Sequence, residues 1–504
     1  MSTTGLNKRN GRQIASLAVG KFLALIFQFM LPIFLARFLS KEGYGIYAQF
    51  NMFEMLFVGT MNLALASGIY YFYPKVEHNG IRPILGNSVI MFFLASAIAF
   101  LLVTRSICGH WIMGDSPVYK YTPVIFIAVF CSLCSGLMAP LYVVTEDNRT
   151  ALYYPLLEII LRVMVVIAVA CWLGGLRGVI VGVLAARLLV LIVVAGYITW
   201  RSDRYSDHRW FDWQLLKAQL AYCLPFAASG ALGTFTGRLD KLICVSYLTP
   251  AEYAVYVVAF LGIPGIEQFY SAIGDVCLTG MAKCFNNHDP KGALELLKDL
   301  EYKSVSVSFP IVFAVCLYAD KVITLVFSDK YADATPYFRV FIFSMLFEML
   351  ASGLIVRASG KTRISMYTGI INAAIVIPTT FYFVRSFGIW GGIISVMIAR
   401  LGQRLLYLLF EIRIVDANLR DYLPWKKLAA IFCVSSILLL PLLGLRYFFD
   451  LHWALCAALS AVYILVSFAA ECYLGVFVIT WKYLREKSMW ICSRHKTGEL
   501  SGNS

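Results

Sequence analysis

Charged residues are scarce in this chain: they make up 14% of its 504 residues, whereas 60% are hydrophobic and the mean hydropathy is +0.74. A soluble domain carries roughly 25% charged residues, so the composition argues against one. Long polar segments that could hold a soluble domain are also missing, because apolar runs recur along the whole chain. These runs reach the roughly 20 residues of a membrane-spanning helix and lack the alternation of a transmembrane β-strand. The sequence therefore predicts an all-α polytopic membrane protein.

Metal-ligand patterns are lacking as well. The chain has six histidines, and the one CxxC spacing, Cys131 and Cys134, lies inside the apolar run "IAVFCSLCSGLMA". Zinc and redox pairs need an accessible loop, so we interpret these two cysteines as apolar filler. We expect no metal and no cofactor, apart from H⁺ or Na⁺ as a coupling ion. The net charge of +14 does not indicate nucleic acid, because basic residues gather in the cytoplasmic loops of membrane proteins.

Fourteen apolar runs are separated by polar interruptions, which predicts about 14 transmembrane helices. Lysine and arginine concentrate in alternate loops and in both terminal segments, so we expect both termini to be cytoplasmic. The runs cover approximately residues 14–38, 46–73, 85–107, 119–144, 151–173, 178–199, 215–247, 251–281, 304–327, 335–357, 364–384, 388–410, 425–446 and 453–481.

The polar segment before the ninth run contains "DPKGALELLKDLEY". We expect Asp289 to be the N-cap of a helix and Pro290 to be its first residue. Leu294, Leu297 and Leu300 fall on one face of such a helix. The pattern predicts an interfacial amphipathic helix that connects two spans.

Two stretches of the chain repeat. "GLRGVIVGVLAARL" at 175–188 matches "GIWGGIISVMIARL" at 388–401, including Arg187 and Arg400. "FLSKEGYGIYA" at 38–48 matches "YLTPAEYAVYV" at 247–257 at nearly the same offset. The repeats predict two parallel six-helix lobes, a cavity at their interface and transport by rocking of the lobes. The predicted organisation is an N-lobe over 1–213, a C-lobe over 214–420, and two further helices with a basic cytoplasmic tail over 421–504.

At "LPIFLARFLSKEGYGIYAQF" (31–50) and "RLDKLICVSYLTPAEYAVYVVAF" (238–260) the chain resembles a known family. It is similar to the polysaccharide-transport branch, the Wzx-type oligosaccharide flippases, of the multidrug/oligosaccharidyl-lipid/polysaccharide (MOP) exporter superfamily. The resemblance implies a V-shaped pair of lobes, as in the multidrug and toxin extrusion (MATE) transporters, with helices 1 and 7 facing a central cavity.

The same resemblance implies the cargo and the location. The cargo would be a polyprenyl-diphosphate-linked oligosaccharide, moved across the bacterial cytoplasmic (inner) membrane for surface polysaccharides such as lipopolysaccharide O-antigen or capsule. Its partners would be this lipid-linked substrate, the membrane and the polysaccharide polymerase or glycosyltransferase machinery.

Charged residues inside the predicted spans are the candidate site, because a charge at the bilayer centre costs roughly 2.5–3.5 kcal/mol. Lys21 lies in helix 1, and Arg238, Asp240 and Lys241 lie in helix 7. A diphosphate needs fixed positive charge, and arginine offers bidentate contacts. We expect Lys21 and Arg238 to hold the head group. The alternatives are that Lys21 snorkels to the cytoplasmic interface and that Arg238 pairs with Asp240 or another residue of its lobe.

Other intramembrane charges have open roles. The repeated Arg187 and Arg400 are either substrate contacts or a structural device that bonds carbonyls or a carboxylate of its own lobe. Glu158 and Arg162 stand four residues apart on one helix face and are expected to pair. Four carboxylates without a partner nearby in the sequence are candidates for coupling to H⁺ or Na⁺: Glu54, Glu267, Asp275 and Glu348.

Alternative functions are a MATE-type H⁺- or Na⁺-coupled drug or cation antiporter, a membrane enzyme and a membrane scaffold. Helices 1 and 7 contribute Lys21, Arg238 and Lys241 against Asp240, which favours an anionic cargo over a cationic drug. No nucleophile and base stand together in the sequence, so we predict no catalytic residues and a transporter rather than an enzyme. A scaffold would leave the cost of the intramembrane charges unexplained.

Overall fold

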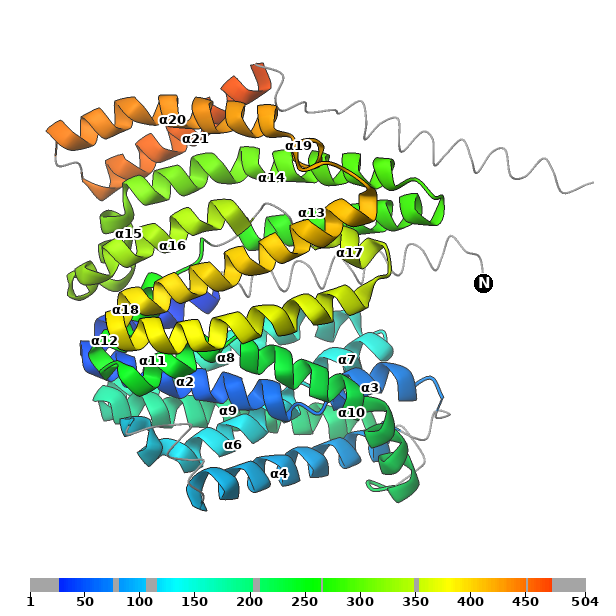
Figure 1. The fold of residues 1–504 in the computed structure, drawn as a ribbon. Coiled ribbons are helices and arrows are strands. Elements are labelled where there is room, and N and C mark those ends of the chain that lie inside the picture. Colours follow the sequence, from blue (N-terminus) through cyan, green and yellow to red (C-terminus); the bar gives the residue numbers. More distant parts are fainter. Residues whose placement is uncertain are drawn as a thin grey trace, which may run out of the picture. The chain divides into compact units, whose positions relative to one another are not determined.

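A computed structural model describes residues 27–75, 81–105, 116–202, 209–263, 266–348, 353–449 and 452–473. Within these ranges all regular secondary structure is helical, and ten helices are long and apolar enough to cross a membrane (Figure 1). A shorter apolar helix covers Phe27–Phe38. The predicted all-α membrane fold is confirmed, whereas the number of fourteen spans stays a prediction.

The helical elements follow one another along the chain with short connections. They are α2 (Lys41–Met61), α3 (Leu65–Phe72), α4 (Ile81–Arg105), η1 (Pro117–Tyr121), α6 (Thr122–Ser135), α7 (Met138–Val144), α8 (Asn148–Leu173), α9 (Gly175–Ser202), α10 (Trp213–Thr236), α11 (Leu239–Tyr247), α12 (Pro250–Ala259), α13 (Ile266–Asn286), α14 (Pro290–Leu317), α15 (Ala319–Phe327), η2 (Asp329–Ala334), α16 (Thr335–Glu348), α17 (Leu354–Ala358), α18 (Thr362–Val415), α19 (Leu419–Tyr422), α20 (Trp425–Phe448) and α21 (Trp453–Tyr473).

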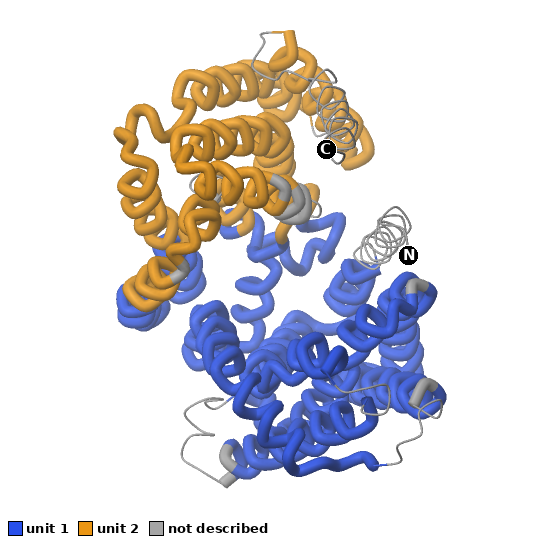
Figure 2. Tube along the Cα trace, turned by 90° about the vertical axis from the view of Figure 1, so that its right-hand side faces the viewer, with its two compact units in different colours: residues 1–261, 323–337, 373–399 blue, residues 262–322, 338–372, 400–504 orange. Residues whose placement is uncertain are grey.

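The chain forms two compact units, each assembled from separate stretches (Figure 2). Unit 1 comprises residues 1–261, 323–337 and 373–399, and unit 2 comprises 262–322, 338–372 and 400–504. The lobe boundaries expected from the repeats, at 213/214 and 420/421, stay a prediction.

The predicted amphipathic segment is not a separate helix. Asp289 caps α14 as expected, because its Oδ1 accepts a hydrogen bond from the Gly292 N–H at 2.8 Å. The three leucines of the segment are buried. However, α14 continues to Leu317, since neither glycine nor proline interrupts the sequence between Gly292 and Pro310. The expected interfacial helix is thus the first half of a long helix.

The first glycine has a positive φ in both copies of the glycine-rich repeat. Gly175 opens α9 with φ of 58°, and Gly388 has φ of 55° at a break inside α18. Glycine adopts this left-handed region without the steric cost of a Cβ. At the glycine three residues later, in both copies, the helix packs closely against the helical segment that precedes it. A Cβ at Gly178 would lie 3.1 Å from the Ala170 Cα, and one at Gly391 would lie 1.9 Å from a backbone oxygen.

The second repeat gives two equivalent helix starts. The Ser40 Oγ accepts the Gly43 N–H at 3.0 Å and caps α2. The Thr249 Oγ1 accepts the N–H of Glu252 at 3.3 Å and caps α12 within a capping box. Within unit 1, α2 and α12 pack so closely that a Cβ on Gly45 would lie 1.7 Å from the carbonyl oxygen of Pro250.

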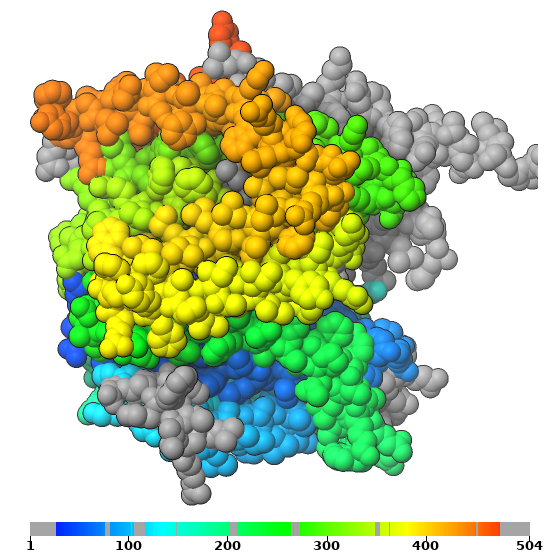
Figure 3. Space-filling view, viewed as in Figure 1, coloured from blue at the N-terminus to red at the C-terminus, as the bar shows by residue number. Residues whose placement is uncertain are grey.

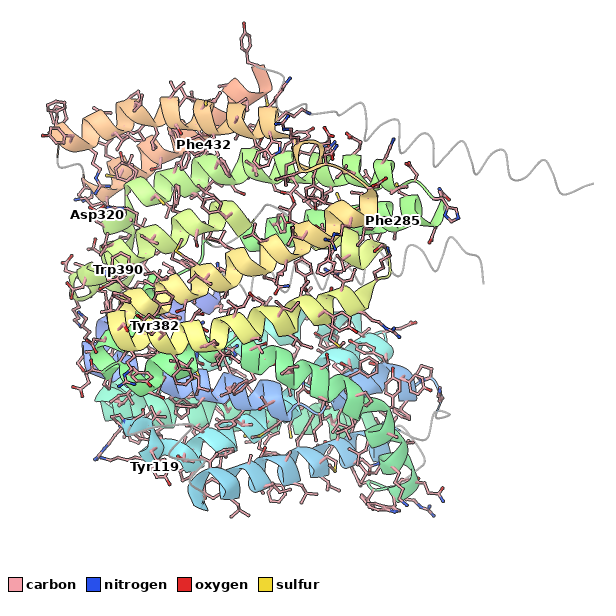
Figure 4. The ribbon with its side chains drawn as sticks, in the orientation of Figure 1. Tyr119, Phe285, Asp320, Tyr382, Trp390 and Phe432 are labelled. Carbon is pink, nitrogen blue, oxygen red and sulfur yellow. The ribbon has the colours of Figure 1, made fainter. Side chains whose placement is uncertain are left out.

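Apolar side chains also cover outward faces, as a membrane requires. On α20, Ile437 is 63% exposed and Leu440 is 60% exposed, and this helix lies at the surface of unit 2 (Figure 3). Another face of α20 packs on α14, where Phe432 meets Phe313 edge-on at a centroid distance of 5.6 Å (Figure 4). A helix that is apolar all round is typical of a membrane span.

Candidate functional site

Unit 1 contains a cavity of about 530 Å³. Side chains from α2, α6, α7, α8, α9 and α10 line it, together with Arg238 at the start of α11. Its lining combines charges, hydroxyls and apolar groups: Glu54, Met55, Val58, Gly59, Ser132, Ser135, Gly136, Ala139, Tyr142, Tyr154, Pro155, Glu158, Arg187, Thr234 and Arg238.

A buried ion pair forms one wall of the cavity. The Arg187 Nη2 of α9 lies 2.7 Å from the Glu54 Oε1 of α2, and the two side chains are 15% and 3% exposed. The Ser132 hydroxyl of α6 donates a hydrogen bond to the same Oε1 at 3.0 Å. Glu54 therefore has a partner that its sequence neighbourhood did not reveal. Arg187 bonds a carboxylate of its own unit, and the pair compensates both buried charges.

Arg238 also lines the cavity, at the N-cap of α11. No hydrogen bond or ion pair joins its side chain to any residue that the structure describes. The alternative pairing with Asp240 is not formed. Asp240 instead accepts the Tyr256 hydroxyl at 2.8 Å and lies 3.6 Å from the Lys241 Nζ. Thus the charge of Lys241 is compensated, whereas the Arg238 side chain has no ion-pair partner among the described residues.

The expected pair of Glu158 and Arg162 does not form, so that prediction is wrong. Both lie on α8, but no ion pair joins them in the described ranges. Glu158 lines the cavity and lies near Tyr154, whereas Arg162 lies near Tyr47. The Arg162 Nε is buried without a hydrogen-bond partner within the described part of the chain. Their side chains thus turn to different neighbours although their Cα atoms share a helix face.

The other predicted site residues are not among the described side chains that line this cavity. Lys21 lies outside the described residues, as do the side chains of Glu267 in α13 and Glu348 in α16. Asp275 of α13 is exposed in unit 2. Arg400 of α18 lies in unit 2 with its guanidinium 4.9 Å from the centroid of the Phe341 ring.

The sequence analysis did not identify the hydroxyl groups of the cavity as candidate site residues. Ser132, Tyr142 and Tyr154 stand in apolar runs, where a polar side chain costs free energy unless it has a partner or a wet surface. The spacing of Tyr154 and Glu158, four residues apart, was an available signal for a polar helix face. In unit 2 the sequence reasoning missed Glu411, which is fully buried and accepts hydrogen bonds from the Tyr422 hydroxyl and the Ile355 N–H.

The family model described as "Polysaccharide biosynthesis protein" matches residues 34–336, which include every residue that lines the cavity. The chain belongs to the polysaccharide biosynthesis protein family. No curated protein matches it significantly.

Solved structures share the fold of this polysaccharide biosynthesis protein. The lipid II flippase MurJ in an inward closed conformation is 14% identical, with a TM-score of 0.67, over 91% of this chain and 99% of that one. An inward-facing multidrug resistance MATE transporter of the MOP superfamily is 14% identical, with a TM-score of 0.60, over 80% and 98%. A eukaryotic MATE transporter is 14% identical, with a TM-score of 0.54, over 83% and 99%.

The family match and these folds confirm the predicted resemblance to the MOP exporter superfamily. The protein is a multi-pass membrane protein with the fold of the flippase and transporters named above.

Proposed function

We propose that the protein flips a polyprenyl-diphosphate-linked oligosaccharide across the bacterial cytoplasmic membrane by alternating access, for the biosynthesis of surface polysaccharide such as O-antigen or capsule. The observation that carries the proposal is Arg238, a guanidinium without a described partner on a cavity of about 530 Å³. The family name and the flippase named among the structural neighbours support the same class of cargo.

A diphosphate-linked sugar presents negative charge and many hydroxyls to a protein. Arg238 could form two parallel hydrogen bonds with a phosphate oxygen pair. We propose that the neighbouring Asp240 and Lys241 stabilise the start of α11, because their side chains pair with each other. Ser132, Ser135 and Thr234 offer hydroxyls to the sugar. Lys21 of helix 1 is the proposed second cation for the diphosphate.

Coupling and orientation complete the proposal. Glu158 is added as a candidate proton acceptor, because it lines the cavity without a hydrogen bond or ion pair to a described residue. The earlier candidates Glu54, Glu267, Asp275 and Glu348 also stay proposals. Both termini are placed in the cytoplasm, where a glycosyltransferase supplies the lipid-linked sugar. A polymerase would use the flipped product on the other side.

The second candidate function is a MATE-type H⁺- or Na⁺-coupled antiporter of drugs or cations. Glu158 is the observation that favours it, because an uncompensated carboxylate on a cavity suits a cationic cargo. In this alternative Arg238 would be dispensable and Glu158 essential. In a flippase Arg238 would be the essential residue.

The experiment is reconstitution in liposomes that carry a fluorescent polyprenyl-diphosphate oligosaccharide, with accessibility measured by an external glycosidase. Wild-type protein should expose the lipid faster than empty liposomes do. Arg238→Gln should slow exposure by about tenfold or more, because a hydrogen bond to a charged group contributes about 1.5–3 kcal/mol. Arg177→Gln, an exposed arginine of α9 away from the cavity, is the matched control.

Equal rates for Arg238→Gln and Arg177→Gln would reject the proposed site while keeping the flippase. Absence of lipid exposure together with uptake of a cationic dye, abolished by Glu158→Gln, would replace the flippase by the antiporter. Size-exclusion profiles of each variant must match that of the wild type before rates are compared.

A further inference from the structure

Unit 2 contains a second cleft, of about 700 Å³, that the proposed transport cycle does not use. It lies where the first half of α14 meets α19 and the start of α20. Arg420, Lys426 and Lys427 line it, with the aromatic rings of Tyr302 and Trp425 beside them. We propose that this cleft binds the headgroup of an anionic phospholipid.

Positive charge in the cleft is in excess. No hydrogen bond or ion pair joins the side chain of Arg420 or that of Lys426 to a residue in the described ranges. Lys427 stacks over the Tyr302 ring at 4.2 Å from its centroid. This contact fixes the lysine without neutralising it, because a ring carries no net charge.

The carboxylates of the cleft are largely compensated by lysines of their own helix. Glu295 pairs with Lys298 at 2.8 Å, and Asp299 pairs with Lys303 at 2.6 Å. Asp421 is the one lining carboxylate for which no pairing is seen within the described residues. Three cations therefore face one uncompensated acid, which favours an anionic ligand.

The position of the cleft along α20 identifies the ligand's source. Trp425 is the first residue of α20, and the apolar span Trp425–Phe448 begins there. Tryptophan and basic residues gather at the membrane interface, at the level of the lipid headgroups. Basic pockets between helices on the cytoplasmic side bind anionic headgroups. A phosphate held at this level is thus expected to belong to a lipid rather than to a free anion.

The cleft is held in shape by one buried and one exposed hydrogen bond. Tyr422 is fully buried and its hydroxyl lies 2.5 Å from the Glu411 Oε2. The Trp425 Nε1 donates a hydrogen bond to the Leu419 carbonyl at 3.2 Å. These bonds fix α19 and the turn that follows it, so the backbone that carries the three cations needs little rearrangement on binding.

Native mass spectrometry tests the proposal on the full chain, purified in detergent and mixed with equal amounts of phosphatidylglycerol and phosphatidylcholine. We expect the wild type to retain phosphatidylglycerol preferentially. The variant Arg420→Gln/Lys426→Gln/Lys427→Gln should lower that preference by at least about fivefold, because one basic residue near an anionic lipid contributes about that factor. The control Lys283→Gln/Lys291→Gln/Arg413→Gln removes the same charge from exposed positions outside the cleft and should keep it.

Three results would overturn the proposal: equal loss of preference in the control, no loss in the cleft variant, or displacement of phosphatidylglycerol by millimolar inorganic phosphate. The last would assign the cleft to a free anion. The single variant Lys426→Gln guards against misfolding, since this exposed side chain has no described partner. This single substitution should lower the preference for phosphatidylglycerol and leave the unfolding temperature unchanged. Flipping activity is not a readout, so failure here leaves the proposed function untouched.

Discussion

The two repeated arginines occupy the same place in their motifs, and the structure describes a different contact for each. Arg187 lies 2.7 Å from the Glu54 carboxylate on the wall of the unit 1 cavity. Arg400 lies over the Phe341 ring in unit 2, 4.9 Å from its centroid. The first glycine of each copy, Gly175 or Gly388, has a positive φ. The repeat therefore keeps a positive φ at its first glycine, and the described contacts of its arginine include a carboxylate in one copy and an aromatic ring in the other.

The largest expected effect comes from breaking the ion pair of the first copy. Arg187→Gln should lower the free energy of unfolding by about 3–5 kcal/mol, because it leaves the Glu54 carboxylate buried and uncompensated. Glu54→Gln/Arg187→Gln should cost less than Arg187→Gln alone, since both charges are then gone. Thermal and denaturant unfolding of the purified protein measures both. A double variant as unstable as the sum of its singles would contradict a pair that acts as a unit.

The glycines of the two copies should respond unequally. Gly391→Ala places a Cβ 1.9 Å from the Phe383 carbonyl oxygen, a backbone atom that cannot rotate away. We expect a loss of about 3 kcal/mol, at the upper end of overpacking costs. Gly178→Ala meets its nearest atom at 3.1 Å and should lose about 1 kcal/mol. Equal losses of unfolding free energy would contradict the tighter backbone contact at Gly391.

Removing the helix caps of the second repeat should lower the free energy of unfolding by a smaller amount, and by similar amounts at the two positions. Ser40→Ala and Thr249→Ala should each lower the free energy of unfolding by about 1 kcal/mol, because each removes the acceptor for one helix-start N–H. Thr249→Ala should cost more, since it also disrupts the capping box with Glu252. Ser40→Asp and Thr249→Asp serve as controls that keep an acceptor and should restore stability. Failure of the aspartates to do so would indicate that packing, not capping, matters there.

Much of the backbone could be predicted from local sequence, because its causes are local. Gly175 and Gly388 mark turns, and Ser40 and Thr249 mark helix starts, each through chemistry within a few residues. The continuity of α14 was missed because a polar first half suggested a surface segment, although neither glycine nor proline lies between Gly292 and Pro310.

The site was less predictable, because its partners lie far apart along the chain. Sequence spacing reveals partners one helical turn away, so Glu158 and Arg162 were expected to pair and do not. Glu54 and Arg187 belong to α2 and α9, and only the packing of those helices brings them together. Arg238 was identified because a cation in an apolar run is costly wherever it points.

The discontinuity of unit 1 has a consequence for biogenesis. Its last stretch, residues 373–399, is synthesised after residues 262–322 and 338–372 of unit 2. Residues at the start of α2 need such late partners: Lys41 pairs with Asp333, and Tyr44 packs edge-on against Tyr331. The start of α2 is therefore synthesised long before these partners, although α6 and α9, which also contact α2, follow it early. Final packing of unit 1 is thus an event that follows the synthesis of residues 373–399.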